Sequence, residues 1–279
     1  MIKKIDALAA DIDMTLTAKG AGLPDIVKEA LTVLHEQGVL LGLATGREIE
    51  EKLLHQGEFW NLGFDFDFIV GMNGGMVYDA KDQSMWTTEL LTVDEMKEIL
   101  TAFMPLIRQY KIAVNVEGGG NHNAMNINGE LLASMKRHGF IFEDKTGDIE
   151  GFCDKPCYKF LFRMEPEYEQ QIRHIFNQQF SDKYQLIVTY PGTVELMRKG
   201  ISKGDGMKRY AEKNHLNLKN VIAFGDNEND NSLLEVCGWG VCLKNGAQGT
   251  KDIADAITEY DCENGGVGHY LFDHCINQQ

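Results

Sequence analysis

The chain has 279 residues, a hydrophobic fraction of 43% and a formal net charge of −15, which is the composition of a folded globular protein with room for two domains. The acidic balance provides no basic stripe that could neutralise nucleic-acid phosphates, so we expect no nucleic-acid partner. A small phosphorylated ligand is compatible with this charge, because a local cation or metal can reverse the field inside a pocket.

The N-terminal segment and the cysteines point to a cytoplasmic protein. Asp6, Asp11 and Asp13 interrupt any apolar stretch behind the first lysines, so we expect no signal peptide. No apolar run is long enough to span a bilayer, and we expect no membrane partner. The six cysteines show no zinc-type spacing, which favours reduced thiols without a chemical role. The oligomeric state cannot be predicted.

The first 80 residues alternate predicted strands and helices. Residues 7–10 form a continuous apolar run, typical of a strand that is buried on both faces of a parallel sheet. Pro24 and Asp25 open a helix that ends near Gly38. A second strand is expected at 39–44, a second helix from 48 to about 56, and a third strand at 68–71. This alternation predicts right-handed βαβ units and a parallel sheet.

The pattern changes near Asp79 and returns near Gly200. Between these points we expect a long helix at 93–110, a second helix at 165–180, and strands at 112–116, 158–162, 184–189 and 193–197. We assign 81–197 to an α+β domain inserted into a core made of 1–80 and 198–279. The core then continues with a helix that begins near Gly204 and a strand at 221–224. The predicted fold class is α/β, with a doubly wound, Rossmann-like parallel-sheet core and the inserted α+β domain.

Four polar clusters stand at the ends of these core elements: Asp11/Asp13/Thr15, Thr45-Gly46-Arg47, Lys203, and Asp226/Asn229/Asp230. Ligands of open α/β sheets bind beyond the carboxyl ends of the strands, so one sheet can gather all four clusters. Carboxylates and a carbonyl suit Mg²⁺. Thr45, the amides that follow it and the charge of Lys203 suit an anion. An aspartate can attack a phosphoryl group.

The stretches DIDMTL, ATGR, GISKGDGM and FGDNENDNSLLE resemble the four signature motifs of the haloacid dehalogenase superfamily, in order and with matching spacing. The chain most resembles the Cof-like sugar-phosphate phosphatases of that superfamily, which carry an α+β cap inserted after the third strand. The resemblance covers both core segments and, in layout, the inserted domain. It departs from the family pattern at Met14, where glycine is usual.

The resemblance implies a role for each matching residue. Asp11 corresponds to the nucleophile, and Asp13 to the acid that protonates the leaving oxygen and later activates water. Thr45 and Lys203 correspond to the pair that holds the phosphoryl group. The implied metal positions are Asp11, the backbone carbonyl of Asp13, and Asp226, with Asn229 and Asp230 as supporting groups; the implied substrate-binding positions are Thr45, Gly46, Arg47, Asn73 and Lys203.

The predicted function is a Mg²⁺-dependent phosphatase that hydrolyses small phosphate monoesters, with sugar phosphates first among them and an aspartyl-phosphate on Asp11. A phosphomutase of the same superfamily is one alternative. A phospho-accepting signalling module is another, which the inserted domain disfavours because such a module needs no lid. Thr45 could also cap the helix behind it, and Arg47 could equally be a structural ion-pair residue. We expect the inserted domain to set the choice of substrate.

Overall fold

The computed structural model describes residues 4–18, 20–138 and 141–276. Residues 1–3, which belong to the N-terminal segment considered for a signal peptide, lie outside the described part. The chain divides into two compact units: a core unit, Met1–Thr88 with Ile201–Gln279, and an inserted unit, Glu89–Gly200. Each unit is described by itself.

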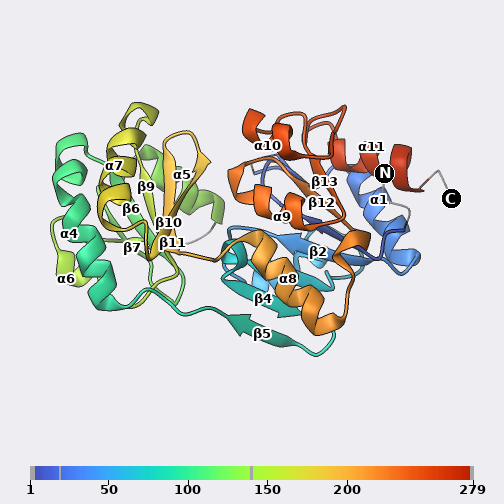
Figure 1. Cartoon of the computed structure of the whole chain (residues 1–279), viewed down its shortest axis with the longest axis horizontal. Coiled ribbons are helices and arrows are strands. Elements are labelled where there is room, and N and C mark those ends of the chain that lie inside the picture. The colour runs from blue at the N-terminus through green and yellow to red at the C-terminus, as the bar shows by residue number, and fades with distance from the viewer. Residues whose placement is uncertain (1–3, 19, 139–140, 277–279) are drawn as a thin grey trace. The chain divides into compact units, whose positions relative to one another are not determined.

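The core unit is built on an eight-stranded sheet in the order β14-β13-β12-β1-β2-β3-β4-β5 (Figure 1). The first six of these strands are parallel, while β4 and β5 extend the sheet as an antiparallel hairpin. The strands are β1 (Ala7–Ala10), β2 (Leu40–Ala44), β3 (Phe68–Gly71), β4 (Met76–Asp79), β5 (Ser84–Thr87), β12 (Val221–Gly225), β13 (Trp239–Cys242) and β14 (Ala256–Ile257). The predicted α/β fold class is confirmed.

Helices cover both faces of this sheet. On one face, α1 (Asp25–Glu36) contacts β2 and α11 (Gly266–Leu271), which continues into a π-helical turn at Phe272–Ile276. On the other face, α8 (Lys203–Asn214) and α9 (Asn231–Val236) pack on β3, β4, β12 and β13. The apolar residues between α8, α9 and the sheet form one buried cluster that includes Ala9, Phe68 and Tyr210. Shorter pieces complete the unit: η1 (Met72–Gly74), η3 (Leu218–Asn220), η4 (Glu228–Asp230) and α10 (Gln248–Ile253).

The core unit extends beyond residue 80, where the sequence pattern first changes. Strand β5 pairs with β4 through residues 84–87, and the compact units divide after Thr88 and Gly200 rather than after residues 80 and 197. Lys213 holds the hairpin, because its Nζ donates to Asp79 Oδ2 at 2.8 Å and to Asp82 Oδ1 at 2.8 Å. Strand β5 is difficult to predict from the sequence, because none of its four residues is fully buried.

The second helix of the core begins later than expected and is broken. In place of a helix from residue 48 to about 56, the chain forms α2 (Glu51–Leu54) and α3 (Gln56–Phe59), with His55 between them. The carbonyls of Thr45 and Arg47 accept the amides of Asn73 at 3.0 Å and Met72 at 2.8 Å. Carbonyls that are used in this way cannot open a helix at residue 46 or 48. Thr45 is therefore not a helix cap.

The inserted unit is an α+β layer with a six-stranded sheet in the order β10-β11-β9-β6-β7-β8. Its strands are β6 (Ala113–Glu117), β7 (Asn123–Met125), β8 (Glu143–Asp144), β9 (Lys159–Arg163), β10 (Tyr184–Tyr190) and β11 (Thr193–Arg198). Its helices are α4 (Val93–Tyr110), α5 (Gly129–His138), α6 (Ile149–Phe152), η2 (Pro166–Tyr168) and α7 (Glu169–Gln179). One face of the sheet forms the buried apolar cluster with α4, α6 and α7.

The remaining expectations concern membranes and thiols. Within the described ranges, no helix combines the length and the apolar character that a membrane crossing needs. All six cysteines are free and buried. Burial raises the pKa of the Cys153 thiol to about 12 and that of Cys237 to about 12, so these thiols are un-ionised at neutral pH.

Candidate active site

Asp11 follows β1 directly and lies at the carboxyl edge of the parallel sheet. Its amide continues the ladder by donating to the Phe224 carbonyl at 3.0 Å. The chain then turns back on itself, because the amide of Leu16 donates to the Asp11 carbonyl at 3.3 Å and that of Met14 to the Thr17 carbonyl at 2.7 Å. Asp11 is 7% exposed. The side chain of Asp13, by contrast, is 40% exposed.

Met14 explains why glycine is usual at its position. Its φ of 67° lies in the left-handed region, where a side chain costs roughly 1–2 kcal/mol. Asn245, which sequence reasoning missed, donates from Nδ2 to the Met14 carbonyl at 2.8 Å. Its Oδ1 accepts the Cys262 amide at 2.9 Å, so Asn245 ties two loops together. No sequence signal marks Asn245, because it lies 231 residues from Met14.

Lys203 is the first residue of α8 and is completely buried. Its Nζ donates to Asp11 Oδ1 at 2.7 Å and to Asp230 Oδ1 at 2.6 Å. A helix N-terminus disfavours positive charge, so these two carboxylates provide the compensation. Gly74 allows the approach of α8, because a Cβ on it would lie 1.9 Å from the Ser202 carbonyl oxygen.

Asp226 and Asp230 come from the loop behind β12. The other oxygen of Asp230, Oδ2, accepts the amides of Asp226 at 2.9 Å and Asn227 at 3.0 Å, which fixes the loop. Gly225 leaves room for this carboxylate, because a Cβ there would lie 2.4 Å from Asp230 Cβ. Thr15 donates from Oγ1 to Asp226 Oδ1 at 2.9 Å. Thr15 stands in the first polar cluster of the sequence, and its bond to Asp226 could not be predicted because the two residues are 211 positions apart.

Thr45 and Asn73 lie at the ends of the next two strands. Thr45 follows β2, is 1% exposed, and accepts the Arg47 amide on Oγ1 at 3.3 Å. Asn73 follows β3 with a φ of 51° and accepts Asn229 Nδ2 on its Oδ1 at 3.1 Å. Asn229 is thus joined to the β3 end. Gly46, between Thr45 and Arg47, is half-buried.

Arg47 binds Asp13 through two nitrogens. Its Nη2 donates to Asp13 Oδ1 at 2.7 Å and to Oδ2 at 2.8 Å, and its Nε donates to Oδ2 at 3.0 Å. Such a fork fixes the plane of the carboxylate as well as its position. The ion-pair role considered for Arg47 is therefore what the structure shows, and its substrate contact stays a prediction.

The electrostatics of the site are dominated by buried acids. Burial, together with the charges of Asp230 and Asp11, raises the pKa of Asp226 to about 8. Burial also raises the pKa of Asp11 to about 7, although the charge of Lys203 opposes this. Burial works against the charge on Lys203, but Asp11 and Asp230 outweigh it and raise the lysine pKa. Without a further cation, the site therefore retains protons near neutral pH.

The donor set fits a hard cation. Asp11, Asp226 and Asp230 each offer a carboxylate oxygen, and these oxygens lie within 4.8 Å of one another. They are oxygen donors with excess negative charge, which is the chemistry that Mg²⁺ and Ca²⁺ require. Because both oxygens of Asp230 already bind Lys203 and backbone amides, Asp11 and Asp226 are the better-placed ligands.

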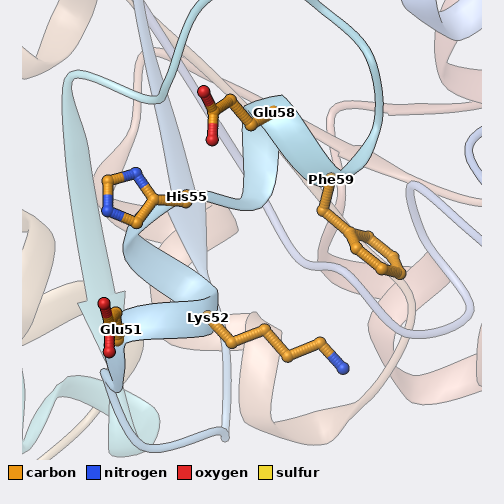
Figure 2. Close-up of a pocket in the computed structure, with 5 residues that line it drawn as sticks. All are labelled: Glu51, Lys52, His55, Glu58 and Phe59. Carbon is orange, nitrogen blue, oxygen red and sulfur yellow. The ribbon is translucent and has the colours of Figure 1, made fainter.

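A separate surface depression of about 530 Å³ lies on α2 and α3 (Figure 2). It is lined by Glu51, Lys52, His55, Glu58 and Phe59. His55 Nδ1 lies 3.0 Å from Asp65 Oδ2. Lys52 Nζ lies over the ring of Phe59. None of the predicted site residues lines this depression, so we place the candidate site at the strand ends.

The fold and the site together define a doubly wound α/β protein with an acidic, lysine-bearing centre at the ends of its parallel strands. A family model of haloacid dehalogenase-like hydrolases matches residues 8–271, and the chain belongs to this family. The resemblance drawn from the four motifs is confirmed.

Relatives and solved structures agree with this assignment. A Streptococcus pyogenes serotype M6 protein, provisionally named a phosphatase, is 30% identical over 280 residues, which cover 98% of this chain and 99% of that protein. The HMP-PP phosphatase of Yersinia pseudotuberculosis serotype I is 24% identical over 264 residues, covering 94% and 93% of the two chains. The structure of the subclass IIB sugar phosphatase BT4131 has a TM-score of 0.81 at 20% identity and covers 97% and 99%, which shows the shared fold.

Proposed function

We propose that this haloacid dehalogenase-like phosphatase hydrolyses small phosphate monoesters, among them sugar phosphates, through an aspartyl-phosphate on Asp11. The observation that carries the proposal is the buried contact of Asp11 with Lys203, at 2.7 Å, at the carboxyl end of β1. It places a carboxylate and an anion-binding charge at the edge of the sheet where ligands of this fold class bind.

A divalent cation, which we propose to be Mg²⁺, would be held by Asp11, Asp226 and the backbone carbonyl of Asp13. Asp230 and Asn229 would support the site from behind. When bound, the cation neutralises the excess carboxylate charge and draws electrons from the phosphoryl group. Its charge would also offset the burial, and with it the mutual repulsion, that otherwise raise the pKa values of Asp11 and Asp226.

Two aspartates, Asp11 and Asp13, carry out the chemical steps. A carboxylate oxygen of Asp11 attacks phosphorus, and the bond between phosphorus and the ester oxygen breaks. Asp13 gives its proton to the departing oxygen. A water molecule then attacks the phosphorus of the aspartyl-phosphate while Asp13 takes a proton from it, which releases phosphate and restores Asp11. Thr45 and Lys203 hold the phosphoryl oxygens throughout.

Arg47 supports these chemical steps by orienting the carboxylate of Asp13. The side chain of Asp13 is 40% exposed and, within the described ranges, the hydrogen bonds to its carboxylate come from Arg47. An exposed carboxylate without such a fork would sample several rotamers. Arg47 is thus a positioning residue for the acid and base.

The substrate class rests on the family and on the named relatives. The sugar phosphatase and the HMP-PP phosphatase both act, by name, on small phosphorylated metabolites, and we assign this chain the same broad class. We propose that the inserted unit, Glu89–Gly200, acts as a cap that selects the leaving group. We propose that the enzyme works in the cytoplasm, without a nucleic-acid or membrane partner.

The test is release of phosphate from p-nitrophenyl phosphate and from a panel of sugar phosphates, with and without Mg²⁺. Asp11→Asn should abolish turnover while the far-ultraviolet circular dichroism spectrum stays unchanged. Asp252→Asn, at an exposed aspartate of α10, is the matched control and should keep full activity. Turnover by deamidation-free Asp11→Asn would disprove covalent catalysis there. A phosphomutase would instead return the phosphoryl group to a second hydroxyl of a sugar bisphosphate.

A further inference from the structure

The face of the inserted sheet opposite its apolar cluster is polar and buried. Strand register places Thr193, Arg163 and Ala113 side by side on this face, and two residues further along Glu195, Leu161 and Asn115. Residues that are paired directly in antiparallel strands point to the same side of the sheet. The alternate residues, among them Phe160, Phe162 and Leu196, belong to the apolar cluster.

Lys159, on this polar face, is fully compensated. Its Nζ contacts Glu195 Oε1 and Oε2, both at 3.1 Å, and Glu117 Oε2 at 3.4 Å. Lys159 is 2% exposed. Glu195 and Glu117 therefore both contact Lys159.

Arg163 is buried without an ionic partner. It is 8% exposed, and its hydrogen bond is from Nε to Asn115 Oδ1 at 3.2 Å. Among the side chains that the structure describes, no carboxylate forms an ion pair with Arg163 and no acceptor is bonded to its two terminal nitrogens. These nitrogens are not among the fully enclosed polar atoms, so they remain accessible to a solute. Asn115 accepts from Arg163 because its own Nδ2 donates to Glu117 Oε1 at 3.2 Å, which fixes the amide.

Thr193, the register partner of Arg163, is also unsatisfied. It is 3% exposed, and its Oγ1 has no hydrogen-bond partner within the described part of the chain. A buried hydroxyl without a partner is destabilising until an acceptor reaches it. A hydroxyl donor of this kind beside a guanidinium is an arrangement that can bind the oxygens of an anion.

We propose that Arg163 and Thr193 form an anion-binding subsite in the inserted unit, which takes the carboxylate or phosphate oxygens of a small metabolite. The terminal nitrogens of Arg163 present a planar pair of donors that matches two oxygens of one acidic group. The Thr193 hydroxyl supplies a third donor from the next strand. Asn115 holds the guanidinium in place through Nε.

The anion has two sources with the same chemistry. It is either a second acidic group on the phosphorylated substrate, in which case the inference rests on the proposed function, or a separate anionic metabolite that regulates the enzyme. Both sources require the same donors, and kinetics distinguishes them.

Binding is tested first, with sulfate as the probe and without reference to activity. Sulfate is titrated into the full-length protein against NaCl of equal ionic strength, and the apparent Kd is taken from the rise in unfolding temperature. Arg163→Gln should weaken this sulfate response at least tenfold, and Thr193→Val several-fold. Arg198→Gln is the matched control and should keep it, because Arg198 is already paired with Glu95 and the Leu90 carbonyl.

Kinetics then compares glycerol 3-phosphate with 3-phosphoglycerate, which has the same three-carbon skeleton and carries a carboxylate in place of the terminal hydroxymethyl group. A tenfold higher KM of Arg163→Gln for 3-phosphoglycerate, with glycerol 3-phosphate within twofold, assigns the anion to the substrate. Loss of sulfate binding without that difference assigns it to a separate effector. An unchanged sulfate response in Thr193→Val and in a folded Arg163→Gln overturns the proposal, whether or not the enzyme is a phosphatase.

Discussion

Binding of Mg²⁺ to the metal-free enzyme should release protons, because the acidic cluster holds protons that the cation replaces. Asp11, Asp226 and Asp230 each have a carboxylate oxygen within 4.8 Å of the others, and the buried Lys203 donates to Asp11 and Asp230. A carboxyl group binds a metal ion in its ionised form. Ionisation of Asp11 and Asp226 therefore accompanies binding.

The size of the effect follows from the two raised pKa values. The pKa of Asp11 is raised to about 7 and that of Asp226 to about 8, and because the two groups interact they titrate as a pair. Binding of one cation at pH 7 should then release on the order of one proton. At pH 9.5 both groups are already ionised, and release should be close to zero.

Isothermal titration calorimetry in three buffers with different ionisation enthalpies measures this number as a slope. Asp226→Asn should release fewer protons and bind Mg²⁺ more weakly, while the exposed-site variant Asp252→Asn should match the wild type. A release of less than about half a proton at pH 7, or equal release at pH 7 and pH 9.5, would refute the reasoning. It would mean that Lys203 alone compensates the cluster.

Three further outcomes are expected. Lys203→Met should lower the free energy of unfolding by about 3–5 kcal/mol in urea titrations, because it leaves buried carboxylates without their cation, and an unchanged midpoint would contradict this. In EDTA, stability should fall as pH rises from about 4 to about 8, since folded Asp11 and Asp226 keep protons that the unfolded chain has lost above its ordinary pKa of 3.8; urea midpoints that rise with pH would exclude it. Asp13→Asn should slow sugar phosphates by about 10²–10⁴-fold and p-nitrophenyl phosphate less, with a burst of p-nitrophenol equal to the enzyme concentration; equal losses without a burst would show that Asp13 shapes the metal site instead.

The core and the four polar clusters could be predicted because each is determined by a short stretch of neighbouring residues. The strands are short apolar runs bounded by polar residues, and helix α1 has a start at Asp25 and a left-handed glycine at Gly38. Parallel strands bring their carboxyl ends to one edge, so Asp11, Thr45 and Asp226 needed no further information to be expected together.

What could not be predicted depends on partners far apart in the chain. The Thr15–Asp226 bond spans 211 residues and the Arg47–Asp13 fork spans 34. The late start of α2 is caused by amides of Met72 and Asn73 that take the carbonyls a helix would need. The short strands β7 and β8 have three and two residues, too few for a period to be recognised.

Several exceptions to local rules lie at the candidate site. Met14, Met72 and Asn73 adopt left-handed backbone angles without being glycine, and Lys203 places a buried positive charge at a helix N-terminus. Such features persist when their surroundings fix them. Asn245 holds the Met14 carbonyl, Thr45 and Arg47 accept the amides of Asn73 and Met72, and two carboxylates neutralise Lys203. Each support is itself part of the site or bonded to it. The strained loops and the charged groups therefore stabilise one another, and a substitution in a strained loop should weaken binding as well as lower the free energy of unfolding.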